Sequence, residues 1–376
     1  MNRKQFLILI VALVVLGGGG LALFWQDIAA YRESGARIGG KLLPEFKVAE
    51  VAQVRLQDAK TQVTLVRKDD RWVVDERAGY TADFQAIGDL IVKLAELKVT
   101  QFEQVGASLL PRVDLVEPGK GEGGGTLVEF KDKPGKALGT LILGKKVLKK
   151  DPLNPLPSAK DGVPAGRYVR IVGSKDQVVV VSDPLNAAEA GPGKWLAKDF
   201  FKADRIRTLA VGPQGAAPQW KIARDVEWGQ WKFAGGGGNL DASAAVGAVN
   251  ALGSPEFKDV VVEPKPEDME KPTVAVAETF DNLTYTVTLA KKKAGDDYDL
   301  AFAVAGEPPR QRVPEKGEKP EDKERRDKDF AENLKKLEER IAREKALAKW
   351  TYVMSKSAVE PLLKDRAQMI ARKERR

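Results

Sequence analysis

The chain has 376 residues, of which 43% are hydrophobic and 31% charged, and its formal net charge is +8. This composition is that of a folded protein of about two domains, not of a disordered chain. It contains no cysteine and no histidine, which excludes disulfides, histidine-based catalytic triads and zinc sites of the usual kind. Because histidine is also the usual acid or base near neutral pH, the sequence predicts a protein that is not an enzyme, with no catalytic, metal-binding or cofactor-binding residues.

The segment 1–35 predicts a cytoplasmic tip, a transmembrane anchor and its flank. Arg3 and Lys4 precede an uncharged run from Phe6 to Trp25, long enough to cross a hydrocarbon core of roughly 30 Å as a helix. Because basic flanking residues usually remain in the cytoplasm, Arg3 and Lys4 place the N-terminus there. We therefore expect a single-pass protein of the bacterial inner membrane with a periplasmic body. The residues expected to contact membrane lipid include Phe6, Leu13, Leu21 and Trp25.

A cleaved signal peptide is the alternative for the same segment. Its apolar core would run from Phe6 to Leu16, and Gly20-Leu21-Ala22 is a tolerable cleavage site. The sequence leaves both alternatives open.

The remainder predicts an internal duplication, with units at 36–202 and 203–376. In each unit, a strand that ends in arginine is followed by a charged turn, a tryptophan and an aspartate suited to cap a short helix. The matched pairs are Arg67 and Arg224, Trp72 and Trp231, and Asp83 and Asp241. In the first unit Phe84, Ile87, Leu90, Ile91 and Leu94 are expected on one face of that helix. The predicted fold class is α+β, with two similar units of mostly antiparallel sheet plus helix.

We expect the similarity to continue beyond the helix. Residues 126–144 align with residues 284–306, so that Gly144 matches Gly306, and a strand containing Tyr168 or Tyr352 closes each unit.

The stretch GTLILGKK, Gly139 to Lys146, fits most of the phosphate-loop pattern. However, Lys146 stands where the loop needs Ser or Thr for Mg²⁺, and the residues between the glycines are typical of a strand. We therefore predict that it is the last strand of a meander.

The second unit carries a charged helical insertion at 314–349 and a basic tail. Four apolar residues recur in the insertion at spacings of four, three and four, which predicts a narrow apolar seam on a helix. They are Phe330, Leu334, Leu337 and Ile341. Two interpretations remain open: a solvated helix that rests on the second unit, or a helix that binds a partner.

Three tryptophans within twelve residues, Trp220, Trp228 and Trp231, form a candidate aromatic face for glycan or peptidoglycan. Core packing is the alternative, because Trp72 and Trp231 occupy equivalent positions.

The chain resembles the bacterial family called domain of unknown function 4340 in several patterns. These are the strand and hairpin patterns, the "AD…I..LI..L" helix and LILGKK…RYVRIVGSKDQVVVVSD. The resemblance covers most of residues 48–200 and, more weakly, 204–365. It implies no catalytic residues. It implies an envelope protein encoded beside subunits of gliding-motility-type ABC transporters.

The predicted function is therefore a non-catalytic, membrane-anchored scaffold of such a transporter, with its permease and auxiliary subunits as partners. The alternative is an envelope module that binds glycan or peptidoglycan. No nucleic-acid-binding signature appears, and the sequence does not indicate whether the chain forms a homo-oligomer.

Overall fold

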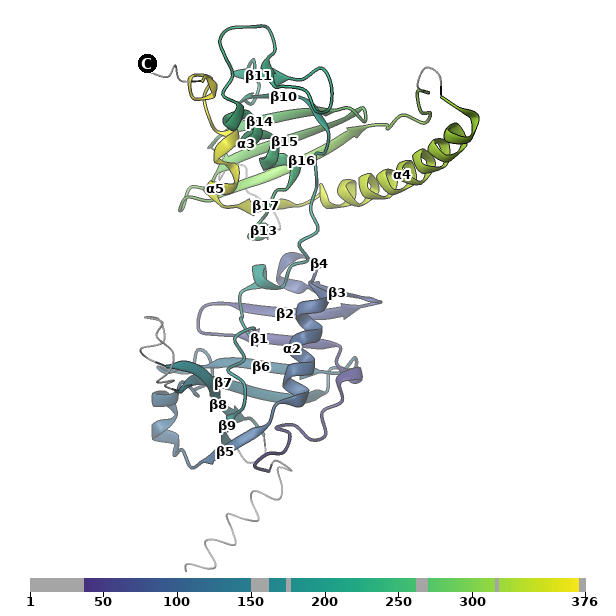
Figure 1. The fold of residues 1–376 in the computed structure, drawn as a ribbon. Helices are drawn as coiled ribbons and strands as arrows, with labels where there is room; N and C mark the ends of the chain where they lie inside the picture. The colour runs from purple at the N-terminus through teal and green to yellow at the C-terminus, as the bar shows by residue number, and fades with distance from the viewer. Residues whose placement is uncertain (1–36, 150–161, 174–176, 262–269, 315–317, 372–376) are drawn as a thin grey trace, which may run out of the picture. The chain divides into compact units, whose positions relative to one another are not determined.

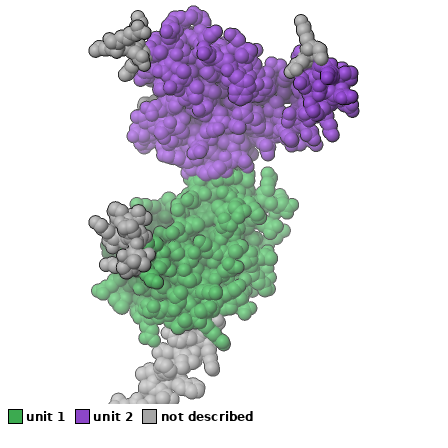
Figure 2. Space-filling view, viewed as in Figure 1, with its two compact units in different colours: residues 1–197 green, residues 198–376 purple. Residues whose placement is uncertain are grey.

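The structure is a computed structural model that describes residues 37–149, 162–173, 177–261, 270–314 and 318–371. The chain divides into two compact units, unit 1 ending at Ala197 and unit 2 beginning at Lys198 (Figure 2). The boundary lies five residues before the one expected from the repeat.

The described part of unit 1 is built on one nine-stranded antiparallel sheet (Figure 1). Its strand order is β4-β3-β2-β1-β6-β7-β8-β9-β5. The helix α2 (Phe84–Glu96) crosses one face of the sheet and connects β4 to β5. The strands are β1 (Gln53–Gln57), β2 (Gln62–Lys68), β3 (Arg71–Val74), β4 (Tyr80–Thr81), β5 (Val99–Glu103), β6 (Thr126–Lys131), β7 (Ala137–Lys149), β8 (Val163–Ile171) and β9 (Gln177–Val181).

In the described part of unit 2, eight strands form a second antiparallel sheet, in the order β12-β11-β10-β14-β15-β16-β17-β13. Three helices belong to it: α3 (Ala242–Gly253), α4 (Pro320–Leu347) and α5 (Lys356–Val359). The strands are β10 (Ile206–Pro213), β11 (Trp220–Ala223), β12 (Lys232–Phe233), β13 (Asp259–Val261), β14 (Glu270–Thr279), β15 (Leu283–Lys291), β16 (Tyr298–Gly306) and β17 (Thr351–Met354).

The two sheets share one topology. When β4 is set aside, the strands of unit 1 and unit 2 follow the same order, with β1 matching β10 and so on to β9 and β17. The connecting helices also begin alike: Asp83 accepts a hydrogen bond of 3.0 Å from the Ala86 amide, and Asp241 accepts one of 2.9 Å from the Ala244 amide.

The matching of strands corrects the later part of the predicted alignment. β6 pairs with the first strand of unit 1, and β14 pairs with the first strand of unit 2. Residues 126–131 therefore correspond to β14, not to the start of β15. In the same way, β7 corresponds to β15, β8 to β16 and β9 to β17. The prediction missed β14 because its Val-Ala alternation is a weak strand signal beside the aromatic and β-branched residues of β15.

Alternation of side chains fixes which face of each sheet is buried. Along β15, Leu283, Tyr285, Val287 and Leu289 are buried, while the residues between them are partly exposed. In α2, Ile87, Leu90, Ile91 and Leu94 are buried as predicted, but Phe84 is 70% exposed. Phe84 is the first residue of the helix and lies outside the buried stripe.

The stretch Gly139–Lys146 is a strand, as predicted, but not the last one of its sheet. It lies inside β7, between β6 and β8. A Cβ atom at Gly144 would overlap the carbonyl oxygen of Val113. The glycine is therefore required by a close approach of two backbone segments, not by a phosphate.

The prediction of a membrane-spanning helix is wrong for the part of the chain that the structure describes. None of the helices in the described ranges is long and apolar enough to cross a membrane. The longest of them, α4, carries eighteen charged side chains in 28 residues. The expected segment, Phe6 to Trp25 with Leu13 and Leu21, lies outside the described residues. The predicted inner-membrane location, single-pass topology and lipid contact depended on that segment, and we do not retain them.

Candidate functional site

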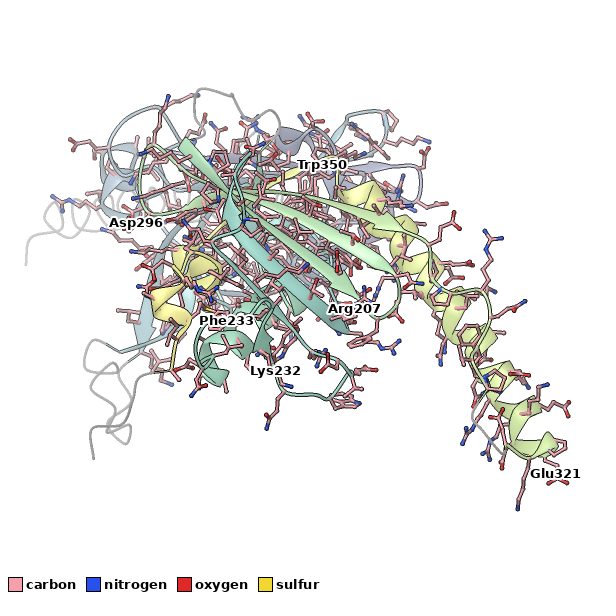
Figure 3. The ribbon with its side chains drawn as sticks, turned by 90° about the horizontal axis from the view of Figure 1, so that it is seen from above. Arg207, Lys232, Phe233, Asp296, Glu321 and Trp350 are labelled. Carbon is pink, nitrogen blue, oxygen red and sulfur yellow. The ribbon has the colours of Figure 1, made fainter. Side chains whose placement is uncertain are left out.

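The helix α4 is the largest difference between the two units. It is inserted between β16 and β17, where unit 1 has only the short connection from β8 to β9. Pro320 occupies the first turn together with Glu321 and Asp322, and Lys345 lies in the last turn, which suits the helix dipole at both ends. Figure 3 shows the Glu321 end projecting away from the sheet, whereas Trp350, just after the helix, lies beside it.

A buried polar cluster fixes the C-terminal part of α4. Glu344 is 2% exposed, and its carboxylate accepts hydrogen bonds from the Tyr285 hydroxyl at 2.8 Å and from the Lys202 amide at 3.0 Å. One turn earlier, Arg340 forms an ion pair of 2.8 Å with Asp204. Burial raises the pKa of the Glu344 carboxyl, although its hydrogen bonds act in the opposite direction.

A second cluster fixes the N-terminal part of the helix. The guanidinium of Arg312 donates two hydrogen bonds, of 3.0 and 2.7 Å, to the two oxygens of Glu318. It also donates to Asp327 at 2.8 and 3.0 Å, and Arg326 donates to Glu318 at 3.2 Å. Because bidentate arginine–carboxylate pairs have a defined geometry, this Arg312 cluster orients the projecting half of the helix.

Between the two clusters, the predicted seam of α4 lines an open groove. Phe330, Leu334 and Leu337 are half-buried, whereas Ile341 is 6% exposed and packs into the unit. The groove has a volume of about 710 Å³. Its other apolar wall comes from the turns after β11 and β14 and from the segment after β16. These residues are Trp228, Phe280, Pro308, Pro309 and Val313.

Trp228, a member of this wall, is almost fully exposed, at 91%. It lies in the turn between β11 and β12, about one hundred residues before the seam in the sequence. Antiparallel pairing of β11, β10 and β14 brings its turn to the end of the sheet where the β14–β15 turn and Phe280 also lie. The groove thus joins one member of the predicted aromatic face to three members of the predicted seam.

The three candidate tryptophans do not form one exposed face. Trp220 is 1% exposed, and its indole nitrogen donates a hydrogen bond of 2.8 Å to the Lys364 carbonyl. Trp231 is half-buried, with the guanidinium of Arg224 4.8 Å from its ring centre. The alternation of β11 directs Trp220 into the core, so only Trp228 presents its ring to solvent.

The groove also contains four arginines, of which three are matched by carboxylates of the same unit. Arg205 pairs with Glu227 at 2.9 Å and with Asp281, Arg340 pairs with Asp204, and Arg312 belongs to the cluster described above. The fourth, Arg224, has no carboxylate within ion-pair distance among the residues that the structure describes. It donates one hydrogen bond, from Nε to the Ile206 carbonyl at 2.7 Å.

Arg224 is instead held by aromatic rings. Its guanidinium lies 4.8 Å from the centre of the Trp231 ring and 5.7 Å from that of Phe280, which is cation–π geometry. Partial burial lowers the pKa of Arg224 from its ordinary value, while nearby Glu227 raises it. A guanidinium remains charged after such a shift.

The same corner of unit 1 has a different chemistry. Arg67, the counterpart of Arg224, lines a surface pocket of about 960 Å³ between the β2–β3 and β6–β7 turns. Charged side chains dominate this pocket, and no aromatic residue lines it. The charged residues are Glu50, Arg67, Lys68, Asp69, Asp70, Asp132 and Lys133. The apolar groove is therefore a feature of unit 2.

Within the described ranges, no group of three or more Asp and Glu side chains is arranged to hold a metal ion. Comparisons with protein-family models, curated proteins and solved structures give no match for this chain. The resemblance to the domain of unknown function 4340 therefore stays a prediction.

Proposed function

We propose that the chain is a non-catalytic docking subunit that binds a segment of a partner protein in the groove along α4. One observation carries the proposal: Phe330, Leu334 and Leu337 stay half-exposed opposite the almost fully exposed Trp228. Their helix is tied to the sheet near its C-terminus and to the segment after β16 near its N-terminus. An apolar groove rimmed by charged residues is typical of interaction sites, and tryptophan is enriched among residues that dominate binding energy.

The fixed position of α4 favours docking over a merely solvated helix. A helix resting on its own unit would bury its seam, as Ile341 does. Here the Glu344 and Arg312 clusters hold the helix so that three seam residues line open space. Prearranged walls reduce the ordering cost that a partner must overcome on binding.

The resemblance to the domain of unknown function 4340 supplies the first class of partner to examine, namely permease and auxiliary subunits of ABC transporters. This choice of partner rests on the resemblance alone. The glycan-binding alternative has a narrower basis than the sequence suggested, because Trp228 is exposed whereas Trp220 is buried and Trp231 is half-buried.

Site-specific photo-crosslinking in the cells that produce the protein tests the proposal. A photoreactive amino acid replaces Trp228 or Leu337 in separate variants, and Val246 in the control. Val246 is a 48% exposed residue of α3 in the same unit and does not line the groove. We expect one and the same protein to be crosslinked from positions 228 and 337 but not from 246. Identical products from all three positions, or crosslinks to glycan alone, would contradict the proposal.

A further inference from the structure

We infer that the segment that occupies the groove is an amphipathic helix with a single acidic side chain, whose carboxylate pairs with Arg224. This inference rests on the proposed docking function and specifies the chemistry of the partner. It follows from the charge pattern of the groove, the shape of its α4 wall and the contrast with unit 1.

The charge pattern indicates one carboxylate. Arg205, Arg312 and Arg340 are neutralised by acidic residues of the chain itself, so they offer little attraction to further acidic groups. Arg224 keeps its charge without such a partner in the described structure, and it lines the groove. Once a partner helix covers the open groove and excludes water, pairing with this guanidinium would form a charge-assisted hydrogen bond that is stronger than the same contact in water.

The setting of Arg224 prepares it for this contact. The Trp231 and Phe280 rings lie within 6 Å of the guanidinium, and the Nε hydrogen bond to Ile206 restricts its rotation. Nε is used by the fold, which leaves the terminal amino groups of the fork for a ligand. A planar carboxylate matches that fork.

The α4 wall favours a helix as the occupant. Phe330, Leu334 and Leu337 recur at spacings of four and three, which is the pattern by which two helices interdigitate. The part of α4 before the buried Ile341 runs from Pro320 to Arg340, a length of roughly 30 Å at the rise of an α-helix. A partner helix of several turns can lie along it, with Trp228 covering its other side.

The corresponding corner of unit 1 lacks the features that favour such a ligand. Arg67 shares its pocket with Asp69, Asp70 and Asp132, and the pocket has neither an aromatic wall nor an inserted helix. Acidic residues outnumber basic ones by one in that pocket, whereas arginines outnumber acidic residues by one in the groove of unit 2. The binding of an acidic amphipathic helix is therefore assigned to unit 2 alone.

The test is a selection of random peptides by phage display against the whole chain. Peptides of about 16 residues, roughly 24 Å long as helices, are selected on the native protein. Their affinities are then measured for the native chain and for Arg224→Gln, Arg224→Lys and Trp228→Ala. Arg207→Gln is the matched control. Arg207 lies in the same sheet, near the start of β10 (Figure 3), but it does not line the groove.

We expect the selected peptides to share apolar residues three and four positions apart and one Asp or Glu. Replacing that acidic residue by its amide should weaken binding to the native chain about tenfold. The same replacement should change binding to Arg224→Gln less than about twofold, and Arg207→Gln should behave as the native chain. Because the peptide is changed on the native protein, the test holds even if Arg224→Gln folds poorly.

The outcomes separate the inference from the proposed function. Peptides that require Trp228 but share no acidic residue, or show no coupling to Arg224, would overturn the inference and leave the docking function standing. Peptides that bind Trp228→Ala as well as the native chain, or the failure to select any peptide, would count against both.

Discussion

The hydroxyl of Tyr285, in β15, donates a hydrogen bond of 2.8 Å to the carboxylate of Glu344 in α4. This contact joins the core of the unit 2 sheet to the helix inserted between β16 and β17. Tyr285 is fully buried and Glu344 is 2% exposed, so neither group has water as an alternative partner. The groove along α4 therefore depends on a polar contact inside the unit.

Removing the Tyr285 hydroxyl should destabilise unit 2. In Tyr285→Phe, one oxygen of Glu344 loses its donor in a buried site, which costs about 1–3 kcal/mol of unfolding free energy. Urea denaturation measures the change. Glu338→Gln on the exposed side of α4 is the control and should alter the free energy by less than about 0.5 kcal/mol. Equal effects of both substitutions would show that the buried contact has no special role.

The stability contributed at Glu344 should decrease as pH rises. Burial raises the pKa of its carboxyl in the folded chain, so between the unfolded value of roughly 4.3 and the raised folded value the native state binds more protons than the unfolded state. The free energy of unfolding of the native chain, relative to Glu344→Gln, should thus fall across that window. A difference that rises with pH would contradict the assignment.

The Arg312 cluster should hold the projecting half of α4. In Arg312→Ala, Glu318 and Asp327 lose their shared guanidinium, so amides between residues 320 and 333 should exchange with deuterium faster than in the native chain. Arg325→Ala is the control, since Arg325 and Asp322 form an exposed pair at 3.1 Å within one turn of the helix. Unchanged exchange in Arg312→Ala would mean that the helix is held by other contacts.

Gly144 should not tolerate a side chain. In Gly144→Ala, the added methyl group would meet the Val113 carbonyl oxygen and the Leu115 side chain, and the strain should cost about 1–3 kcal/mol. Gly173→Ala, where nothing lies near the added atom, is the control. Urea denaturation of both variants measures the change in the free energy of unfolding. A Gly144→Ala variant as stable as the native chain would show that β7 and the Val113 segment can separate freely.

Two local features of the structure could be read from the sequence: the matching arginine and tryptophan positions of the two units, and the helical spacing of the seam. Arg67 and Trp72 are register partners across β2 and β3, and Arg224 contacts Trp231 in the corresponding turn. Such pairs are close in sequence, so their spacing survives in both copies. The seam was visible because residues of one helix face recur with a fixed period.

The opposite wall of the groove could not be predicted. Trp228 and Phe280 come within reach of Leu334 through the pairing of β10 with β11 and β14, and β14 was missed. Without that strand, the β14–β15 turn had no place in the sheet. Long-range pairing of this kind is set by packing of the whole sheet rather than by any local pattern.

The central claim is tested most directly by hydrogen exchange of the whole chain, measured with and without its partner. The partner is the protein captured by the photoreactive residues at positions 228 and 337. Docking in the groove predicts that the partner slows exchange in three segments: the β11–β12 turn around Trp228, residues 306–313 and residues 330–340. The free chain provides the reference, and unit 1 provides an internal control. Slowing confined to unit 1, or to unit 2 segments away from the groove, would show that the partner binds elsewhere.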